Sequence, residues 1–201
     1  MLLNCHTYYS FCYGTLSPEE LLDEVQRKGY DTFVLTDINT TTAVLDTIRL
    51  AAQRGIKVIV GIDFRNGVQQ QYIGIAKNNA GFKALNEHLS EHLHQGKPFA
   101  AQAPELENTF VIYPLHNYSG FALRPNEYIG IAASDLLRWT YTPARKQADR
   151  LVVLQPVTFI YKQHFNAHRL LHAIDKKIGK RQLDVKRPKR DSLHFDYFDS
   201  T

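Results

Sequence analysis

Short apolar runs alternate with longer amphipathic segments along most of the chain. Residues 32–36 and residues 57–61 are β-rich runs typical of buried strands, and residues 1–5 form a shorter one. The spacing of apolar residues between these runs predicts helices that begin at Ser17 and at about Thr42. Strands that alternate with helices indicate an α/β fold with parallel strand pairing and right-handed crossovers.

The first predicted helix carries clear signals at both ends. Ser17 is suited to cap the helix, Pro18 to occupy its first position, and Glu20 to complete a capping box. Gly29 marks the end, because glycine readily adopts the left-handed conformation found there. The side chains expected to face the core are Leu21, Leu22 and Val25.

Two further helices are predicted from the spacing of apolar residues alone. The second helix should end at Gly55 and place three side chains inward, namely Leu45, Ile48 and Ala52. A final helix is predicted over residues 165–178. The residues expected on its apolar face are Leu170, Leu171, Ile174 and Ile178.

The middle of the chain repeats the strand and helix unit less regularly. A helix is marked by Phe82, Leu85 and Leu89, and residues 96–108 are typical of a loop. Further strands are predicted over residues 72–76, 110–113, 128–132 and 151–154. Six or seven strands in about 180 residues fit an open doubly wound sheet or a compact βα barrel. The sequence has no GxGxxG motif or P-loop after a predicted strand, which disfavours the nucleotide-binding versions.

The composition is that of an ordinary globular protein, with 201 residues of which 44% are hydrophobic and 22% charged. Residues 1–175 carry equal numbers of basic and acidic side chains, so the net charge of +4 comes from residues 176–201. A nucleic-acid-binding domain would instead spread basic residues over one face. The sequence shows no membrane span, no secretory signal and no disulfide framework, since Cys5 and Cys12 are its only cysteines. A cytoplasmic location is expected.

Three side chains able to bind metal follow the first three predicted strands: His6, Asp37 and Asp63. The carboxyl ends of neighbouring parallel strands meet at one rim of a βα fold, so these side chains should converge there. One imidazole and two carboxylates are adequate ligands for zinc, manganese or iron. Each residue also has a structural interpretation: His6 as a partner of loop groups, Asp37 as a cap of the following helix and Asp63 as an acceptor for turn amides. Both interpretations are open on the residues alone.

The motifs around these residues resemble a known family. NCHTYYS-x₃-G-x₂-SPEEL, FVLTD and VIVGIDF are similar to the amino-terminal third of a PHP (polymerase and histidinol phosphatase) domain. GIAKNNAGFKALNEHLS and FNAHRLLHAID resemble the version at the start of bacterial replicative DNA polymerase III alpha subunits. The resemblance spans about residues 1–178. It implies a distorted, TIM-like (β/α)7 barrel whose active members bind up to three metals and hydrolyse phosphoesters.

The same motifs depart from the family's metal ligands. Where the family has His-x-His, Thr-Asp-His and Gly-x-Glu, this chain has Asn4-Cys5-His6, Thr36-Asp37-Ile38 and Gly61-Ile62-Asp63. The later Asp-x-His falls at Thr158-Phe159-Ile160. Isoleucine cannot coordinate a metal, so apolar packing is expected to fill the former metal cavity. The resemblance then implies a degenerate site of His6, Asp37 and Asp63 without a catalytic residue, holding at most one weakly bound zinc or manganese ion.

The favoured interpretation is a PHP domain, residues 1–178, at the N-terminus of a replicative DNA polymerase III alpha subunit. Residues 179–201 would be a basic tail or the start of a linker to a polymerase region that this chain lacks. The parent protein would be a DNA-directed DNA polymerase, a nucleotidyltransferase of DNA replication. The domain alone would be inactive, would contact the remainder of the alpha subunit and would dock a proofreading exonuclease subunit. Only weak, nonspecific DNA contact is expected, through residues 176–190.

Two alternatives stay open beside this interpretation. One is a metal-dependent phosphoesterase of the PHP family that works with a reduced site, and the other is a stand-alone binding module.

His88 and His92 also share a helical face at a spacing that can bind metal, although no HExxH motif is present. The aromatic segment 8–13 is expected to pack over the mouth of the barrel. An exposed or interface stripe is expected from His164, His168 and His172.

Overall fold

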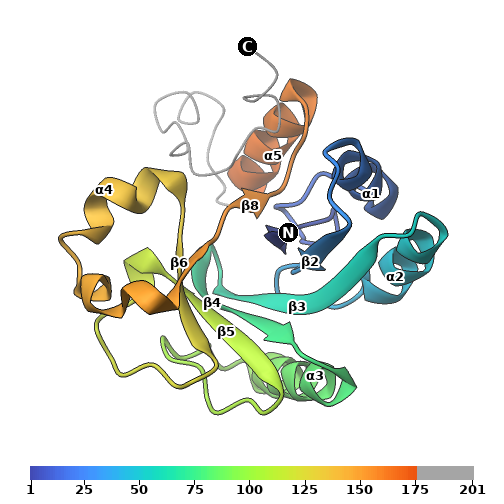
Figure 1. The fold of residues 1–201 in the computed structure, drawn as a ribbon. Coiled ribbons are helices and arrows are strands. Elements are labelled where there is room, and N and C mark those ends of the chain that lie inside the picture. Colours follow the sequence, from blue (N-terminus) through green and yellow to red (C-terminus); the bar gives the residue numbers. More distant parts are fainter. Residues whose placement is uncertain (176–201) are drawn as a thin grey trace.

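The computed structural model describes residues 1–175, and its centre is one curled sheet of eight strands with helices around the outside (Figure 1). The strands lie in the order β7-β6-β5-β4-β3-β2-β1-β8. The predicted α/β fold of the distorted-barrel type is confirmed, with eight strands in place of the expected seven. The last predicted turn of the final helix, the basic residues 176–190 and the tail 179–201 lie outside the described residues.

The elements follow one another along the chain in an alternating order. The strands are β1 (Leu2–Cys5), β2 (Thr32–Leu35), β3 (Lys57–Asn66), β4 (Gln69–Ala76), β5 (Thr109–Pro114), β6 (Glu127–Ile131), β7 (Leu151–Val153) and β8 (Pro156–Val157). The helices are α1 (Pro18–Arg27), α2 (Val44–Gln53), α3 (Asn79–Gln95), α4 (Leu136–Trp139) and α5 (Lys162–Asp175). Residues 96–108 contain no helix or strand, as predicted.

The strand pairing is mixed, which corrects the prediction of parallel pairing throughout. The pairs among β1, β2 and β3, among β5, β6 and β7, and between β1 and β8 are parallel, whereas β4 is antiparallel to both β3 and β5. β3 continues past its predicted end at Gly61 to Asn66 and turns back through Gly67 and Val68. Gly67 has φ +56, which glycine adopts without a side-chain clash. A hairpin therefore replaces the expected crossover at this point.

The two strands at the ends of the sheet are consecutive along the chain. β7 ends at Val153, and β8 begins at Pro156 on the far side of β1. The backbone N–H of Leu154 donates to the carbonyl of Ile131 at 2.9 Å, and that of His6 donates to the carbonyl of Val157 at 2.9 Å. These bonds continue the pairing of β7 with β6 and of β8 with β1, so the short segment between β7 and β8 connects the two edges of the curled sheet. The chain after β8 thereby lies beside the carboxyl end of β1.

Helix α1 begins and ends as its sequence predicts. The Ser17 hydroxyl accepts from the Glu20 backbone N–H at 3.1 Å, and the Glu20 carboxylate accepts from the Ser17 N–H at 2.8 Å. Gly29 follows the helix with φ +73. The predicted inward residues Leu21, Leu22 and Val25 are fully buried.

The predicted inward faces of α2 and α5 are wrong. In α2 the buried side chains are Val44, Thr47 and Ala51, while Leu45 and Ile48 are 78% and 42% exposed. The short Thr47 and Ala51 side chains let this helix lie close to α1 and β3. In α5 the buried side chains are His168 and Ala173, and the exposed ones include Leu170 and Ile174. No helix within residues 1–175 is long and apolar enough to cross a membrane.

Each central strand buries both of its faces. In β2, Phe33 and Leu35 pack in the outer core with helix α1, while Val34 packs in the inner core with Ile73 and Ile112. Both sides of the sheet are thus filled by apolar side chains. Polar side chains gather where β1, β2 and β3 leave this core.

Candidate functional site

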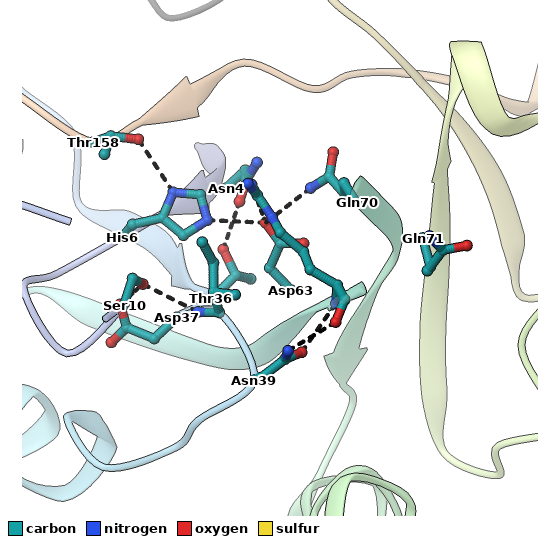
Figure 2. Close-up of polar contacts among 12 residues, drawn as sticks. Asn4, His6, Ser10, Thr36, Asp37, Asn39, Asp63, Gln70, Gln71 and Thr158 are labelled. Atoms are coloured by element: carbon teal, nitrogen blue, oxygen red, sulfur yellow. Dashed lines mark hydrogen bonds and ion pairs between the residues drawn. The ribbon is translucent and has the colours of Figure 1, made fainter. Parts of the chain in front are cut away.

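The three predicted site residues lie at the same edge of the sheet, and all are buried (Figure 2). His6 follows β1 and Asp37 follows β2, as predicted. Asp63 lies inside β3 rather than at its end, because the strand continues to Asn66. The structure brings the side chains of His6 and Asp63 into direct contact, whereas the Asp37 carboxylate has a separate set of partners.

Both ring nitrogens of His6 have partners within the fold. Nε2 lies 3.1 Å from Oδ2 of Asp63 and donates to it, because an ionised carboxylate only accepts. Nδ1 lies 3.3 Å from the hydroxyl of Thr158, which follows β8. The imidazole therefore connects the segments that follow β1 and β8 to a residue within β3 (Figure 2).

One oxygen of Asp63 accepts four hydrogen bonds. Besides His6, its Oδ2 accepts from Nε of Arg65 at 3.0 Å, from Nη2 of Arg65 at 2.6 Å and from the side-chain amide of Gln70 at 2.9 Å. Burial alone would raise the pKa of Asp63, but the Arg65 guanidinium and the His6 hydrogen bond lower it to about 2. Asp63 is therefore ionised near neutral pH. Its other oxygen, Oδ1, is buried and has no hydrogen-bond partner among the described residues.

Arg65 lies on the same face of β3 as Asp63 and is only 9% exposed. Its backbone is held by the side-chain amide of Asn39, which accepts from the Arg65 N–H at 2.9 Å and donates to the Arg65 carbonyl at 2.8 Å. Its guanidinium carbon lies 4.5 Å from the centre of the Tyr13 ring. Burial acts to lower the pKa of Arg65, but the Asp63 carboxylate raises it above its ordinary value.

The sequence signals for Arg65 and Gln70 are present but indirect. Alternate residues of a strand share a face, so Arg65 joins Asp63 once β3 is known to extend past Gly61. Gly67 marks the turn that sends the chain back and returns Gln70 to the same place. Because the predicted strand ended at Gly61, the sequence pattern did not place Arg65 or Gln70 in the site.

The Asp37 carboxylate is bound by neutral groups of the loop after β1. Oδ1 accepts from the Thr7 backbone N–H at 2.6 Å and from the Ser10 hydroxyl at 2.7 Å, and Oδ2 accepts from the Thr7 hydroxyl at 2.7 Å. The Ser10 oxygen in turn accepts from the Ile38 N–H at 3.0 Å. A loop amide and two hydroxyls thus hold Asp37, and the N-cap of helix α2 is Ala43, which corrects the interpretation of Asp37 as a helix cap.

The expected apolar filling of the centre is not what surrounds Asp63. Ile160 packs in the outer core with Cys5 and Val157, and Arg65 and Gln70 occupy the surroundings of the carboxylate. Asn4, which stands where the family has its first histidine, accepts from the Thr36 hydroxyl at 2.9 Å. The amide oxygen of Asn4 thus accepts a local hydrogen bond, at a position where the family has an imidazole.

Tyr13 covers the centre and joins it to helix α5. Its ring meets the ring of His6 edge to face at 5.2 Å and that of His168 at 4.7 Å. Nδ1 of His168 lies 2.6 Å from the Tyr13 carbonyl oxygen. His168 is therefore a buried packing residue, which corrects the prediction of an exposed stripe. Phe11, in the same loop as Tyr13, is 88% exposed and does not cover the barrel mouth as expected.

Two clefts flank the covered centre. They have volumes of about 410 and 450 Å³, and both are lined by Tyr13 and Arg65. The first also contains Ile38, and the second contains Gln70 and Asn4. The guanidinium thus lies at the boundary between the buried carboxylate and the open face of the barrel.

His88 and His92, whose spacing can also bind metal, instead have partners within the fold. Nε2 of His88 lies 2.7 Å from the Tyr72 hydroxyl, and Nδ1 of His92 lies 3.0 Å from the His88 carbonyl oxygen. Both rings pack against Phe99. Burial, together with the neighbouring His92, lowers the pKa of His88 to about 4. The two imidazoles serve the aromatic core beneath α3.

The possible metal ligands around Asp63 and Asp37 do not fit a multinuclear metal site. Such a site needs several imidazoles and carboxylates that hold two ions about 3.5–4 Å apart. Asp37 directs both oxygens to Thr7 and Ser10, and the first oxygen of Asp63 is shared by a guanidinium, an imidazole and an amide. Within residues 1–175, no group of three or more His, Cys, Asp or Glu side chains is arranged to hold a metal ion.

Comparison with known families decides the identity of the fold. The PHP domain family matches residues 3–124, which is more than half of the chain. The chain belongs to the PHP family. This confirms the family that the motifs around His6, Asp37 and Asp63 indicated.

The curated relatives of this PHP chain are error-prone DNA polymerases. The polymerase of Teredinibacter turnerae is 30% identical over 78 residues, which are 39% of this chain and 8% of the relative. That of Pseudomonas syringae pv. syringae is 28% identical over 83 residues, which are 41% of this chain and 8% of the relative. The matched region thus covers less than a tenth of the length of either polymerase.

Solved structures with similar folds have low sequence identity to this chain. An amidohydrolase from Chromobacterium violaceum has a TM-score of 0.48 and 14% identity, covering 78% of this chain and 87% of that protein. A two-domain protein from Bacteroides vulgatus, described as containing a predicted PHP-like metal-dependent phosphoesterase, has a TM-score of 0.43 and 15% identity. That alignment covers 79% of this chain and 51% of the Bacteroides protein.

Proposed function

We propose that this chain is the PHP domain of a bacterial DNA polymerase and that it works there as a structural, partner-docking domain rather than as a hydrolase. Membership of the PHP family and the local similarity to two error-prone DNA polymerases support the polymerase assignment. The site residues His6, Asp37 and Asp63 are then the remnant of a metal centre. Their present role is to hold the barrel together.

The observation that carries this proposal is that groups of the protein itself occupy both oxygens of Asp37 and one oxygen of Asp63. A hydrolytic metal centre needs carboxylate oxygens that are free to bind ions and to orient a water molecule. Here Asp37 accepts three hydrogen bonds and Oδ2 of Asp63 accepts four. A metal ion bound to Asp37 or to Oδ2 of Asp63 would have to displace several of these donors.

The same bonds support a bracing role. The Asp63 cluster connects β3 to β1 through His6, to β4 through Gln70 and to the segment after β8 through Thr158. The Asp37 cluster ties the segment after β2 to the loop after β1. Together they join the segments that leave the carboxyl edge of the sheet, which is what a metal ion does in a metal-braced barrel.

Exposed apolar side chains support a docking role. Phe11, in the loop after β1, is 88% exposed, and Leu137 and Tyr141, which follow β6, are 85% and 92% exposed. Large apolar side chains at a protein surface favour contact with another protein surface. We assign these loops to contacts with the remainder of the polymerase and with a proofreading exonuclease subunit.

The hydrolase question is tested on the chain purified without chelator. We expect no turnover of phosphodiester or single-stranded DNA substrates with added Mn²⁺ or Zn²⁺, and less than one tightly bound ion per chain by elemental analysis. The His6→Ala variant is the control, since it removes the imidazole. Two or more bound ions in the unmodified chain, with turnover that is lost in His6→Ala, would replace the scaffold proposal by the phosphoesterase alternative.

The polymerase assignment is tested by the mass of the native gene product, detected in cell extract with an antibody to this chain. We expect a polypeptide several times the 23.1 kDa of this chain. A product of about the same mass as the chain would favour the stand-alone binding module instead.

Duplex DNA binding by the chain should be weak, should fall steeply with salt and should be lost on deletion of residues 180–201.

A further inference from the structure

The group closest to the Asp63 carboxylate is a positive charge supplied by the protein itself. Nη2 of Arg65 lies 2.6 Å from Oδ2 of Asp63, and Nε lies 3.0 Å from the same oxygen. We propose that Arg65 is the built-in cation of this PHP centre and that its guanidinium takes the place of a metal ion. This inference rests on the proposed non-hydrolytic role and names the residue that makes the metal dispensable.

The charge balance requires a cation at this position. Asp63 is completely buried and lies 2.6 Å from the Arg65 guanidinium, and a buried ionised carboxylate without a partner is strongly destabilising. His6 and Gln70 donate to the same oxygen, but neither needs to carry a charge to do so. Of the four donors to this oxygen, only the two from Arg65 belong to a group that is always charged.

Arg65 is held in place from two sides, as a metal ligand shell would hold an ion. The amide of Asn39 pairs with both the N–H and the carbonyl of Arg65, which fixes the backbone from which the side chain starts. The Tyr13 ring lies against the guanidinium at 4.5 Å and covers it on the side of the barrel mouth. Asn39 has φ +50, a backbone conformation that asparagine tolerates better than most residues.

A guanidinium in this place also opposes metal binding. A divalent ion bound to Oδ2 at about 2.1 Å would lie within about 5 Å of the Arg65 nitrogen, where two like charges in a buried site repel strongly. The unmodified chain should therefore gain no stability from Zn²⁺ or Mn²⁺. Removal of the guanidinium leaves Asp63 and His6 facing a space that opens to the two clefts, through which an ion can enter.

The test compares thermal unfolding of four forms of the chain, each with chelator and with an excess of Zn²⁺ or Mn²⁺. Arg65→Met removes the charge and keeps most of the side-chain stem. Asp63→Asn/Arg65→Met removes both charges and keeps both shapes. Arg54→Met is the matched control, because Arg54 also pairs with an aspartate, Asp23 at 2.8 Å, but at the surface.

We expect Arg65→Met to lower the melting temperature by roughly 10 °C in chelator, because it leaves Asp63 buried without a counter-charge. Zn²⁺ or Mn²⁺ should recover at least half of that loss in Arg65→Met. The same ions should not shift the unmodified chain, the double variant or Arg54→Met. The double variant should melt closer to the unmodified chain than Arg65→Met does.

Several results would overturn the proposal. An equal metal-induced shift in the unmodified chain would show that Arg65 and the ion coexist. A folded Arg65→Met variant that no ion stabilises would show that the guanidinium does not stand where a metal can bind. If Arg65→Met and the double variant both fail to fold, the Arg65 side chain acts through packing and not as a cation.

The proposed function fails in different experiments from these. Phosphodiester turnover by the unmodified chain, or a native product of about this chain's mass, would remove the scaffold or the polymerase assignment. Neither result depends on the melting temperature of Arg65→Met. The melting series in turn measures no activity.

Discussion

Asp37 and Asp63 are two buried carboxylates at the same edge of one sheet, and the protein satisfies them in different ways. Asp37 is surrounded by neutral donors, namely one backbone amide and two hydroxyls. A single oxygen of Asp63 accepts hydrogen bonds from a guanidinium, an imidazole and an amide. The comparison shows that a buried carboxylate can be satisfied either by a local loop that wraps around it or by a cation placed beside it.

The largest effect on stability is expected from removing the wrapped carboxylate. Asp37→Ala leaves the Thr7 N–H and the hydroxyls of Thr7 and Ser10 without their acceptor, at a cost of about 3–5 kcal/mol in the free energy of unfolding. Urea denaturation measures it. Asp46→Ala is the control, since Asp46 is mostly exposed in α2 and forms a surface ion pair with Arg49. Equal losses in the two variants would refute the role of the loop.

The next effect is the pH dependence of Asp63. Although burial alone would raise it, Arg65 and His6 hold the pKa of folded Asp63 at about 2, below its ordinary 3.8. A depressed carboxylate pKa stabilises the fold fully above about pH 4 and loses that contribution as the pH falls toward 2, amounting to about 2 kcal/mol. Denaturation at a series of pH values should show this loss in the unmodified chain and a smaller one in Asp63→Asn.

Two histidines act in a separate, higher pH window. Burial lowers the pKa of His88 and of His168 from 6.5 to about 4, so their neutral forms are favoured in the fold. Their contribution is complete above pH 6.5 and decreases as the pH falls toward 4. His88→Gln should remove the contribution of His88 from this window, leave that of His168, and not alter the window below pH 4. A change in both windows would mean that the two regions are coupled.

A smaller effect is expected from Ser10→Ala. The variant removes one of two donors to Oδ1 of Asp37 and the acceptor for the Ile38 N–H, and it should cost about 1–2 kcal/mol. The measurement is again the free energy of unfolding in urea. Ser10→Thr restores the hydroxyl and should recover most of the loss. If it does not, the size of the side chain rather than its hydroxyl is what the loop requires.

The smallest effect is expected at Gln70. Gln70→Ala removes one neutral donor from Oδ2 of Asp63, which keeps its three bonds to His6 and Arg65. The loss should be below about 1 kcal/mol, because the remaining donors still satisfy the oxygen. Ser10→Ala and Gln70→Ala each remove one neutral donor, so their ratio compares the two carboxylates directly. A larger loss at Gln70 would reverse the comparison.

The sequence predicts helix α1 and the ends of β1 and β2 well because their signals are local. The capping box at Ser17 and the left-handed glycine at residue 29 act within a few residues, and the structure contains both. The positions of His6 and Asp37 follow in the same way from strands of clear apolar character. Local chemistry was sufficient there.

The surroundings of Asp63 required contacts that the sequence pattern does not contain. β3 extends through residues 62–66 because β4 pairs with it, and that pairing depends on the turn at Gly67. The Arg65 backbone is held by Asn39, which lies in another loop, and His6 bonds to Thr158 at the far end of the described chain. The inward face of α2 likewise depends on its neighbours, which accept Thr47 and Ala51 rather than Leu45.

The pairing of β8 with β1 has a consequence for the order of folding. Asn4 lies opposite Pro156 and Cys5 opposite Val157, so this contact closes a loop of about 150 residues. Contacts between such distant residues form slowly, and during synthesis β1 leaves the ribosome long before its partner. Until residues 156–157 emerge, β1 has one unpaired edge that can bind another extended chain. The nascent chain is therefore most prone to aggregation just before its barrel closes.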